Sequence, residues 1–303
     1  IRSANYWGGY GAQNPEIWAR LFDENGGVLA DWFHPLPAAG GTYCIDSREV
    51  RERFGLEPFA GSLFIHALRV RGHDVVKYAL DTFGADGMPV LSATHDANAW
   101  PADLYAGLPA PEAGERVVLW VQNSHPIPIP ASAIGMNVMG SDQVAWHGDP
   151  IPAFGTRAID TSTLLPEAAW PQQIEIQAGR YFVRPRYEVF NTGQMRSRIA
   201  HANVERTDLA ADPKLADLGP ALGKGFILPL PILPKADFHT SMLPTPMSTA
   251  QQELPLKLVI YDPDGKEITT KPLGRLLRAN QGLLDMDELS EGLGDYGHGE
   301  LMY

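Results

Sequence analysis

The chain has 303 residues, of which 44% are hydrophobic and 20% are charged, and it contains 30 Gly and 26 Pro. This length accommodates about two average domains, and so much Gly and Pro excludes a coiled coil, a helical bundle and a collagen-like or disordered chain. The formal charge of -12 would repel nucleic acid and an anionic membrane surface, so we expect neither as a partner.

The apolar segments are too short to cross a bilayer. The longest, residues 226–234, has nine residues and three prolines, whereas a spanning helix needs about 20. We therefore expect no membrane insertion. Cys44 is the only cysteine, which excludes an intramolecular disulfide and a thiolate zinc cluster. Because it stands in the apolar run 42–45, we expect a buried and unreactive thiol.

A pattern of four elements recurs along the chain at intervals of about 120 residues. It begins with an apolar run that ends in an acidic turn, and a second run follows. The first runs and their turns are 18–22 before Asp23-Glu24-Asn25-Gly26, 136–139 before Gly140-Ser141-Asp142, and 256–261 before Asp262-Pro263-Asp264-Gly265. Because Asp, Asn and Gly tolerate the backbone angles of a tight reversal, each turn is predicted to close a β-hairpin.

Each copy of the pattern continues with an aspartate that opens a short helical turn, at Asp46, Asp160 and Asp285. Aspartate is a favoured N-cap because its carboxylate accepts hydrogen bonds from unpaired backbone N–H groups. A glycine that begins an apolar strand closes the pattern, at Gly61, Gly179 and Gly299. We interpret the pattern as an internal repeat.

Short aromatic and branched runs between Gly and Pro turns predict an all-β fold of tandem antiparallel β-sandwich units with short capping helices. The units resemble immunoglobulin-like or jelly-roll arrays in a general way, and no motif identifies one family. We expect a first unit at 1–105, a second at 106–223 and a third, incomplete unit at 224–303. Two explanations of the incomplete unit stay open: a longer protein, or completion of the third unit by the N-terminal strands.

The densest polar segment is 94–101, which contains His95, Asp96, Asn98 and Trp100. Fainter copies of this segment contain His201 and Asn203 in the second unit, and Trp7 near the N-terminus. Each copy follows the strands predicted for one unit and precedes the next apolar run of the chain. These residues are the candidates for contact with a ligand.

Two interpretations of these polar loops stay open. In the first, His and Asn side chains bind a ligand, and Trp7 or Trp100 stacks on a sugar ring. In the second, Asn side chains bond to the backbone and close the turns, while Trp packs against the end of a sandwich. Recurrence favours the structural interpretation, because a single active site need not be repeated in every unit.

A metal site would combine His95, Asp96, His125, His201 and His239, because imidazole and carboxylate are ordinary zinc ligands. The sequence has no HExxH motif, no His-x-His motif and no Cys ligand to support such a site. We therefore predict no metal and no other cofactor. The sequence also lacks a GxSxG elbow, a P-loop and a dinucleotide-binding fingerprint.

The expected function is a non-catalytic binding or scaffold protein whose inter-unit grooves hold a carbohydrate or protein partner. An extracytoplasmic location, periplasmic or secreted, would fit this function. The alternative is a hydrolase, acting on saccharides, with its site at the junction of the first and second units. Two carboxylates in one cleft, or His95, Asp96 and His201 at one point, would favour the hydrolase. The sequence does not predict the oligomeric state.

Overall fold

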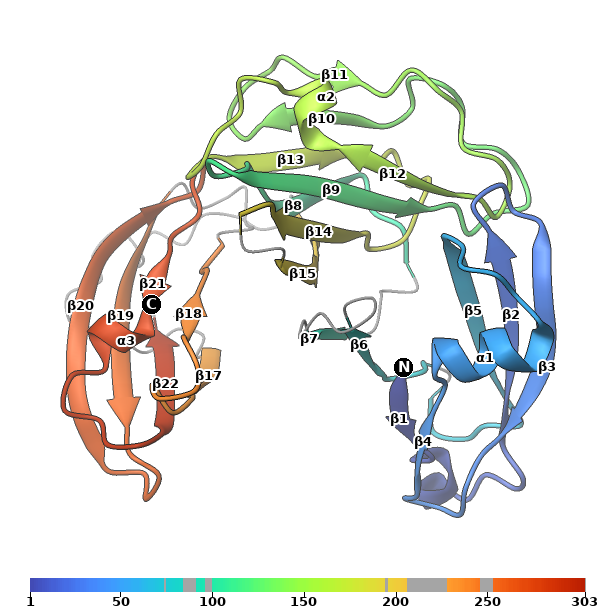
Figure 1. Ribbon diagram of the computed structural model, residues 1–303, viewed down its shortest axis with the longest axis horizontal. Helices are drawn as coiled ribbons and strands as arrows, with labels where there is room; N and C mark the ends of the chain where they lie inside the picture. The colour runs from blue at the N-terminus through green and yellow to red at the C-terminus, as the bar shows by residue number, and fades with distance from the viewer. Residues whose placement is uncertain are drawn as a thin grey trace.

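The computed structural model describes residues 1–73, 75–83, 91–95, 100–193, 196–205, 228–245 and 253–302. In this part of the chain, antiparallel sheets dominate and the helices are few and short (Figure 1). The predicted all-β fold with short capping helices is confirmed. None of the described helices is long and apolar enough to cross a membrane.

The first unit, described within residues 1–95, packs a three-stranded and a four-stranded sheet around one apolar core. The strand orders are β3-β2-β5 and β4-β1-β6-β7. Trp7, Ile17 and Trp32 lie in the core. The elements are β1 (Arg2–Ala4), a 3-10 helix η1 (Trp7–Tyr10), β2 (Glu16–Asp23), β3 (Val28–Pro35), β4 (Thr42–Cys44), α1 (Ser47–Phe54), β5 (Gly61–Leu68), β6 (Ala79–Phe83) and β7 (Leu91–His95).

The second unit, described within residues 104–204, has a five-stranded and a four-stranded sheet in the orders β11-β10-β13-β8-β16 and β12-β9-β14-β15. Tyr105, Leu119 and Phe182 are fully buried in its core. The elements are β8 (Leu104–Pro109), β9 (Glu115–Gln122), β10 (Gly135–Val138), β11 (Ala145–Trp146), β12 (Thr156–Asp160), α2 (Thr161–Leu164), β13 (Gln173–Gln177), β14 (Arg186–Asn191), β15 (Arg196–His201) and β16 (Asn203–Val204).

The third unit, described within residues 228–302, has a four-stranded sheet in the order β17-β22-β19-β20 and a two-stranded sheet of β18 and β21. Leu258, Ile260 and Met286 form the centre of its smaller core. The elements are β17 (Leu228–Ile232), β18 (Ser241–Met242), β19 (Glu253–Tyr261), β20 (Glu267–Leu277), β21 (Leu284–Asp285), α3 (Met286–Leu289) and β22 (Gly297–Met302).

One pattern of strand pairing recurs in all three units. In the first unit β1 pairs with β4, and β2 pairs with both β3 and β5. The equivalent pairs are β8 with β13 and β9 with β12 and β14 in the second unit. They are β18 with β21 and β19 with β20 and β22 in the third. The repeated sequence elements therefore occupy a repeated antiparallel framework.

The predicted aspartate caps are confirmed in each unit. The side chain of Asp46 accepts a hydrogen bond from the backbone N–H of Arg48 (2.8 Å) at the start of α1. Asp160 caps α2 in the same way, and Asp285 caps α3. In the first unit the capped helix α1 follows β4, and in the third unit α3 follows the equivalent strand β21. In the second unit α2 instead precedes the equivalent strand, β13.

The closing glycines were predicted correctly only in the first unit. Gly61 begins β5, and a Cβ there would lie 2.0 Å from the carbonyl oxygen of Phe22. The residue with the same contact in the third unit is Gly297, whose Cβ would lie 2.2 Å from the Tyr261 carbonyl oxygen. The predicted Gly299 is therefore two residues too late. Gly179 lies in a turn before β14, so the strand predicted there is wrong.

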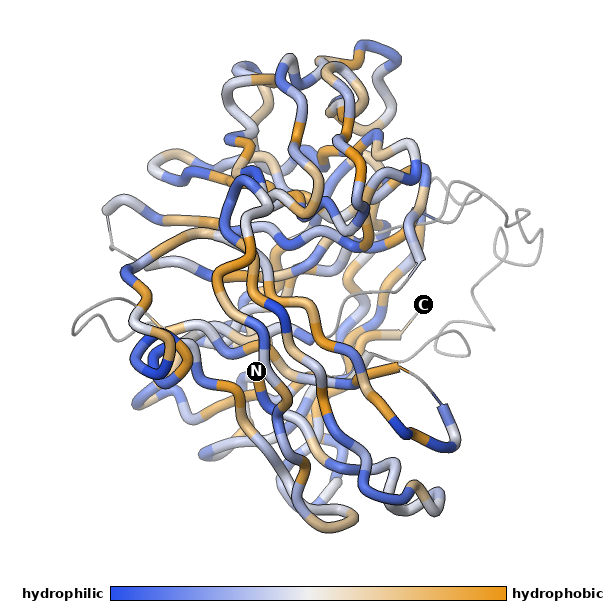
Figure 2. Tube along the Cα trace, turned by 90° about the vertical axis from the view of Figure 1, so that its right-hand side faces the viewer, coloured by the Kyte–Doolittle hydropathy of each residue, from blue (hydrophilic) through white to orange (hydrophobic). Residues whose placement is uncertain are grey.

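The second unit stands between the other two, as Figure 1 shows, and Figure 2 shows apolar and polar residues interspersed along the strands. The N-terminal strands β1 and β2 pair with other strands of the first unit. The boundary predicted between residues 105 and 106 falls inside β8. The division of the chain into domains stays a prediction.

Among the described residues, the first unit meets the second at two places. At one, the hairpin turn after β2 abuts the loop before β12, where the rings of Phe22 and Phe154 stack with their centroids 4.9 Å apart. At the other, β7 lies beside β15. The hydroxyl of Ser92 accepts a hydrogen bond from the N–H of Ile199 (2.7 Å) and donates one to its carbonyl (3.1 Å).

A buried polar network joins the second unit to the third. Arg278 forms an ion pair with the buried carboxylate of Glu205 and lies 3.7 Å from Glu175. The side chain of Gln173, which is fully buried, donates to the Arg278 carbonyl (2.8 Å) and accepts from the N–H of Gly107 (2.8 Å). The segment after β20 is therefore anchored on the five-stranded sheet of the second unit.

Candidate functional site

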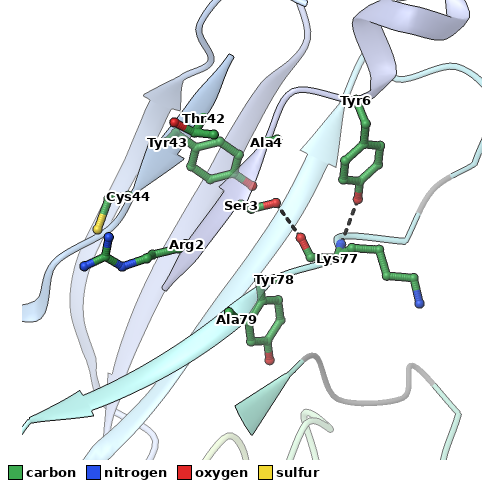
Figure 3. A pocket seen from close by; sticks show the side chains of 10 residues that line it. All are labelled: Arg2, Ser3, Ala4, Tyr6, Thr42, Tyr43, Cys44, Lys77, Tyr78 and Ala79. Carbon is green, nitrogen blue, oxygen red and sulfur yellow. Dashed lines mark hydrogen bonds between the residues drawn. The ribbon is translucent and has the colours of Figure 1, made fainter. Parts of the chain in front are cut away.

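A concave pocket of about 720 Å³ lies on the first unit, where β1 and β4 meet the segment that leads into β6 (Figure 3). Tyr6, Tyr43 and Tyr78 line it, and we call it the tyrosine pocket. The three rings come from separate segments, which antiparallel pairing of β1 with β4 and β6 brings together. The pocket therefore depends on the folded first unit.

Hydrogen bonds fix the inner wall of the tyrosine pocket. The hydroxyl of Tyr6 donates to the carbonyl of Val75 (2.5 Å) and accepts from the N–H of Lys77 (2.7 Å). The hydroxyl of Ser3 donates to the carbonyl of Lys77. Burial raises the pKa of Tyr43. These contacts hold the segment before β6 against β1.

The charged side chains at the tyrosine pocket are cationic. Arg2 and Lys77 line it, and among its described lining residues none is acidic. Asp81 lies beside the pocket and accepts a hydrogen bond from Nε of Arg2 (2.6 Å). The pocket thus carries a positive local charge, although the whole chain has a formal charge of -12.

Cys44 also lines the tyrosine pocket, and it is exposed rather than buried as predicted. Successive side chains of a strand point to opposite faces. In β4 the largely buried side chain of Tyr43 packs on the core and also borders the pocket, whereas Thr42 and Cys44 are exposed. The apolar run 42–45 predicted a strand, but it did not show to which face of the strand the Cys44 side chain would point.

Tyr78 connects the pocket to the contact between the first and second units. Its hydroxyl accepts a hydrogen bond from Nη2 of Arg186 (3.2 Å), and the same nitrogen donates to the carbonyl oxygen of His95 (2.6 Å). Arg186 lies at the start of β14 and is 8% exposed. A buried guanidinium depends on such partners to offset its lost hydration.

Two predicted site residues meet at this contact. The Nε2 atoms of His95 and His201 lie 2.6 Å apart, with their rings edge to face and the centroids 4.3 Å apart. His95 ends β7 and His201 ends β15. The Nδ1 atom of His201 lies 3.1 Å from the carbonyl oxygen of Ala202. Because a carbonyl only accepts, Nδ1 carries the proton, and neutral His201 presents an unprotonated Nε2 to His95.

The surroundings of His201 favour its neutral form. Burial lowers its pKa to about 4, and the charges of Arg184, His95 and Arg186 act in the same direction. The hydrogen bond to the Ala202 carbonyl opposes them. His201 therefore enters the contact with His95 as a neutral ring at neutral pH.

The remaining predicted residues lie apart from this pair or outside the described part of the chain. Trp7 is fully buried in the first core, where its Nε1 donates to the His73 carbonyl (2.8 Å). Trp100 is 79% exposed. Asn203 lies half-buried in β16, opposite Ala106. Asp96 and Asn98 are outside the described residues.

The two other histidines considered as metal ligands lie elsewhere. His125 follows the buried Asn123, whose carbonyl oxygen Oδ1 accepts a hydrogen bond from the His125 N–H (3.0 Å). His239 lies beside Asp287 in the third unit. The four histidines considered together as metal ligands are therefore not all gathered at one point, and Asp96 is outside the described residues.

Sequence reasoning did not identify the tyrosine pocket. Its rings are far apart in the chain, and tyrosine is common in strands. One signal was present: Lys77 is the only lysine before residue 213. A comparison of the chain with models of protein families, with curated proteins and with solved structures finds no match.

Proposed function

We propose that this chain is a non-catalytic binding protein that holds a saccharide in the tyrosine pocket of its first unit. The observation that carries the proposal is the make-up of the pocket, in which three tyrosines, the hydroxyls of Ser3 and Thr42 and two cations surround about 720 Å³. Aromatic rings pack on the apolar faces of sugars, and a few placed polar groups fix the orientation of a ligand.

The described lining of the pocket supports binding rather than hydrolysis. Glycoside hydrolysis usually requires two carboxyl groups on either side of the scissile bond. Among the described lining residues no carboxyl group is present, and the neighbouring Asp81 is held by Arg2. A bound saccharide would therefore lack the acid and base that cleavage needs at this place.

A hydrolase with its site at the junction of the first and second units is the second candidate. The contact of His95 with His201 favours it, because a neutral imidazole with an unprotonated Nε2 is suited to accept a proton. Arg184 and Arg186 beside His201 would then stabilise a developing negative charge. This candidate predicts turnover of a saccharide and its loss in the variant H201Q.

A glycan-array screen of the full chain, followed by calorimetric titration of the strongest hit, tests the proposal. The variant A79W places an indole at an exposed residue of the pocket rim and is expected to abolish binding. The variant Y78A is expected to weaken binding by about tenfold. Y296A, which removes an exposed tyrosine of the third unit, serves as the matched control and should bind as the wild type does.

Three results would contradict the proposal. Unchanged binding in A79W would exclude the tyrosine pocket as the site. Absence of any glycan hit would exclude a saccharide as the ligand. Release of reducing sugar from a bound glycan, lost in H201Q, would replace the binding protein with the hydrolase.

A further inference from the structure

We infer that the third unit carries a site for a divalent transition-metal ion, formed by His239, Asp285 and Asp287. One ligand atom from each side chain is within 4.8 Å of the other two. An imidazole nitrogen with two carboxylate oxygens is a ligand set that zinc and similar ions accept. Three protein ligands leave at least one coordination position for water.

The backbone holds the two carboxylates in place before any ion binds. Asp285 pairs with Ser241 across β21 and β18. Its Oδ1 accepts hydrogen bonds from the N–H groups of Asp287 (2.9 Å) and Glu288 (3.3 Å). Met286, between the two aspartates, is fully buried, and its N–H donates to the Thr240 carbonyl (2.9 Å). The burial of Met286 therefore directs its two neighbours toward the surface.

The third ligand comes from the loop before β18. The Nδ1 atom of His239 lies 2.7 Å from Oδ2 of Asp287, and the imidazole is exposed. The other oxygen of Asp287 accepts a hydrogen bond from the N–H of Thr240 (3.4 Å). The pairing of β18 with β21 holds the loop that carries His239 close to the two aspartates.

A histidine–aspartate ion pair alone would not use the second carboxylate. Oδ1 of Asp285 caps the helix, and its Oδ2 accepts no hydrogen bond from the described residues. This oxygen adds to the negative charge beside His239. A divalent ion between the three side chains would give Oδ2 a partner and would neutralise the two carboxylates.

One cation lies beside the two carboxylates of the cluster. Lys235, whose ammonium donates to the Asp287 carbonyl (2.5 Å), reduces the local negative charge. We expect moderate affinity for this reason.

Calorimetric titration of the chelator-treated full chain with zinc chloride tests the site. The wild type is expected to bind one equivalent, and H239A and D287N are expected to bind roughly tenfold more weakly or worse. D237N changes an exposed carboxylate of the same loop outside the cluster, so it should bind as the wild type does. Thermal denaturation without zinc establishes that the variants are folded.

Two results would overturn the site. The first is no stoichiometric zinc binding by the wild type. The second is zinc binding that survives both H239A and D287N. If this surviving binding is lost in H201A, the ion lies at the contact of His95 and His201 instead. Because neither outcome depends on a saccharide, this test is independent of the proposed function.

Discussion

The Nε2 atoms of His95 and His201 lie 2.6 Å apart, although 106 positions separate the two residues in the chain. The contact joins the last described strand of the first unit to an edge strand of the second. Two copies of one short polar motif thus meet across the contact between neighbouring units. Tyr78 and Arg186 connect this contact to the tyrosine pocket.

The histidine contact is expected to weaken in acid. The pKa of His201 is about 4 in the folded chain, against 6.5 for an ordinary histidine, so the unfolded chain binds more protons between these values. The contribution of His201 to stability is therefore complete above about pH 6.5 and is lost as the pH falls toward 4. The groups that face it, His95, Arg184 and Arg186, are basic and add repulsion when it becomes charged.

Melting temperatures of the wild type and H201Q across pH 4 to 7 would measure this effect. The difference between the two curves should vary most between pH 6.5 and about 4, while H125Q should follow the wild type. Parallel curves for the wild type and H201Q would contradict a titrating contact.

Gly26 is expected to be less replaceable than Gly265, although both end an acidic hairpin turn. Both have positive φ, of 84° and 79°, so alanine at either costs about 1 to 2 kcal/mol. A Cβ on Gly26 would also lie 1.9 Å from the carbonyl oxygen of Ala153, whereas Gly265 has no neighbour within 4 Å. Urea denaturation should find G26A about 1 to 3 kcal/mol less stable than G265A. Equal losses of unfolding free energy in G26A and G265A would contradict this prediction, because they would mean that the backbone at Ala153 moves aside at no cost.

The pair of Glu205 and Arg278 is expected to matter for the contact of the second and third units. The side chain of Glu205 is fully buried, so E205A leaves the Arg278 charge with only the more distant Glu175 (3.7 Å) and should cost about 3 to 5 kcal/mol. The double variant E205M/R278M removes both charges and should recover most of the loss. E253A, which breaks the exposed pair with Arg275, should cost at most about 1 kcal/mol. A loss in E205A no larger than in E253A would contradict this account.

The cap of α1 is expected to contribute a modest share of stability. D46A removes the hydrogen bond to the Arg48 N–H and should cost about 1 kcal/mol, whereas D46N keeps an acceptor and should cost less. Contacts with Arg48 lower the pKa of Asp46 to about 2. The charge-dependent part of the stabilisation is therefore present above about pH 4 and is lost as the pH falls through about 2. Circular dichroism during acid titration of D46N and the wild type measures this part.

The sequence by itself determined the local features of the fold. The acidic turns at Asp23 and Asp262 and the caps at Asp46 and Asp285 follow from interactions between residues at most four positions apart. Such interactions depend on residue type and spacing alone, so a repeated pattern of residues predicts them. The short apolar runs between Gly and Pro turns likewise predicted the all-β class.

Only the tertiary structure decided which distant side chains meet. It placed Tyr78 beside Arg186 and His95 against His201, and it turned Cys44 outward and Trp7 inward. A shift of one residue in strand register moves a side chain to the opposite face of a sheet, and short motifs alone do not show which register the paired strands adopt. The tyrosine pocket and the cluster of His239, Asp285 and Asp287 depend on pairings between segments far apart in the chain, which is why composition and spacing did not predict them.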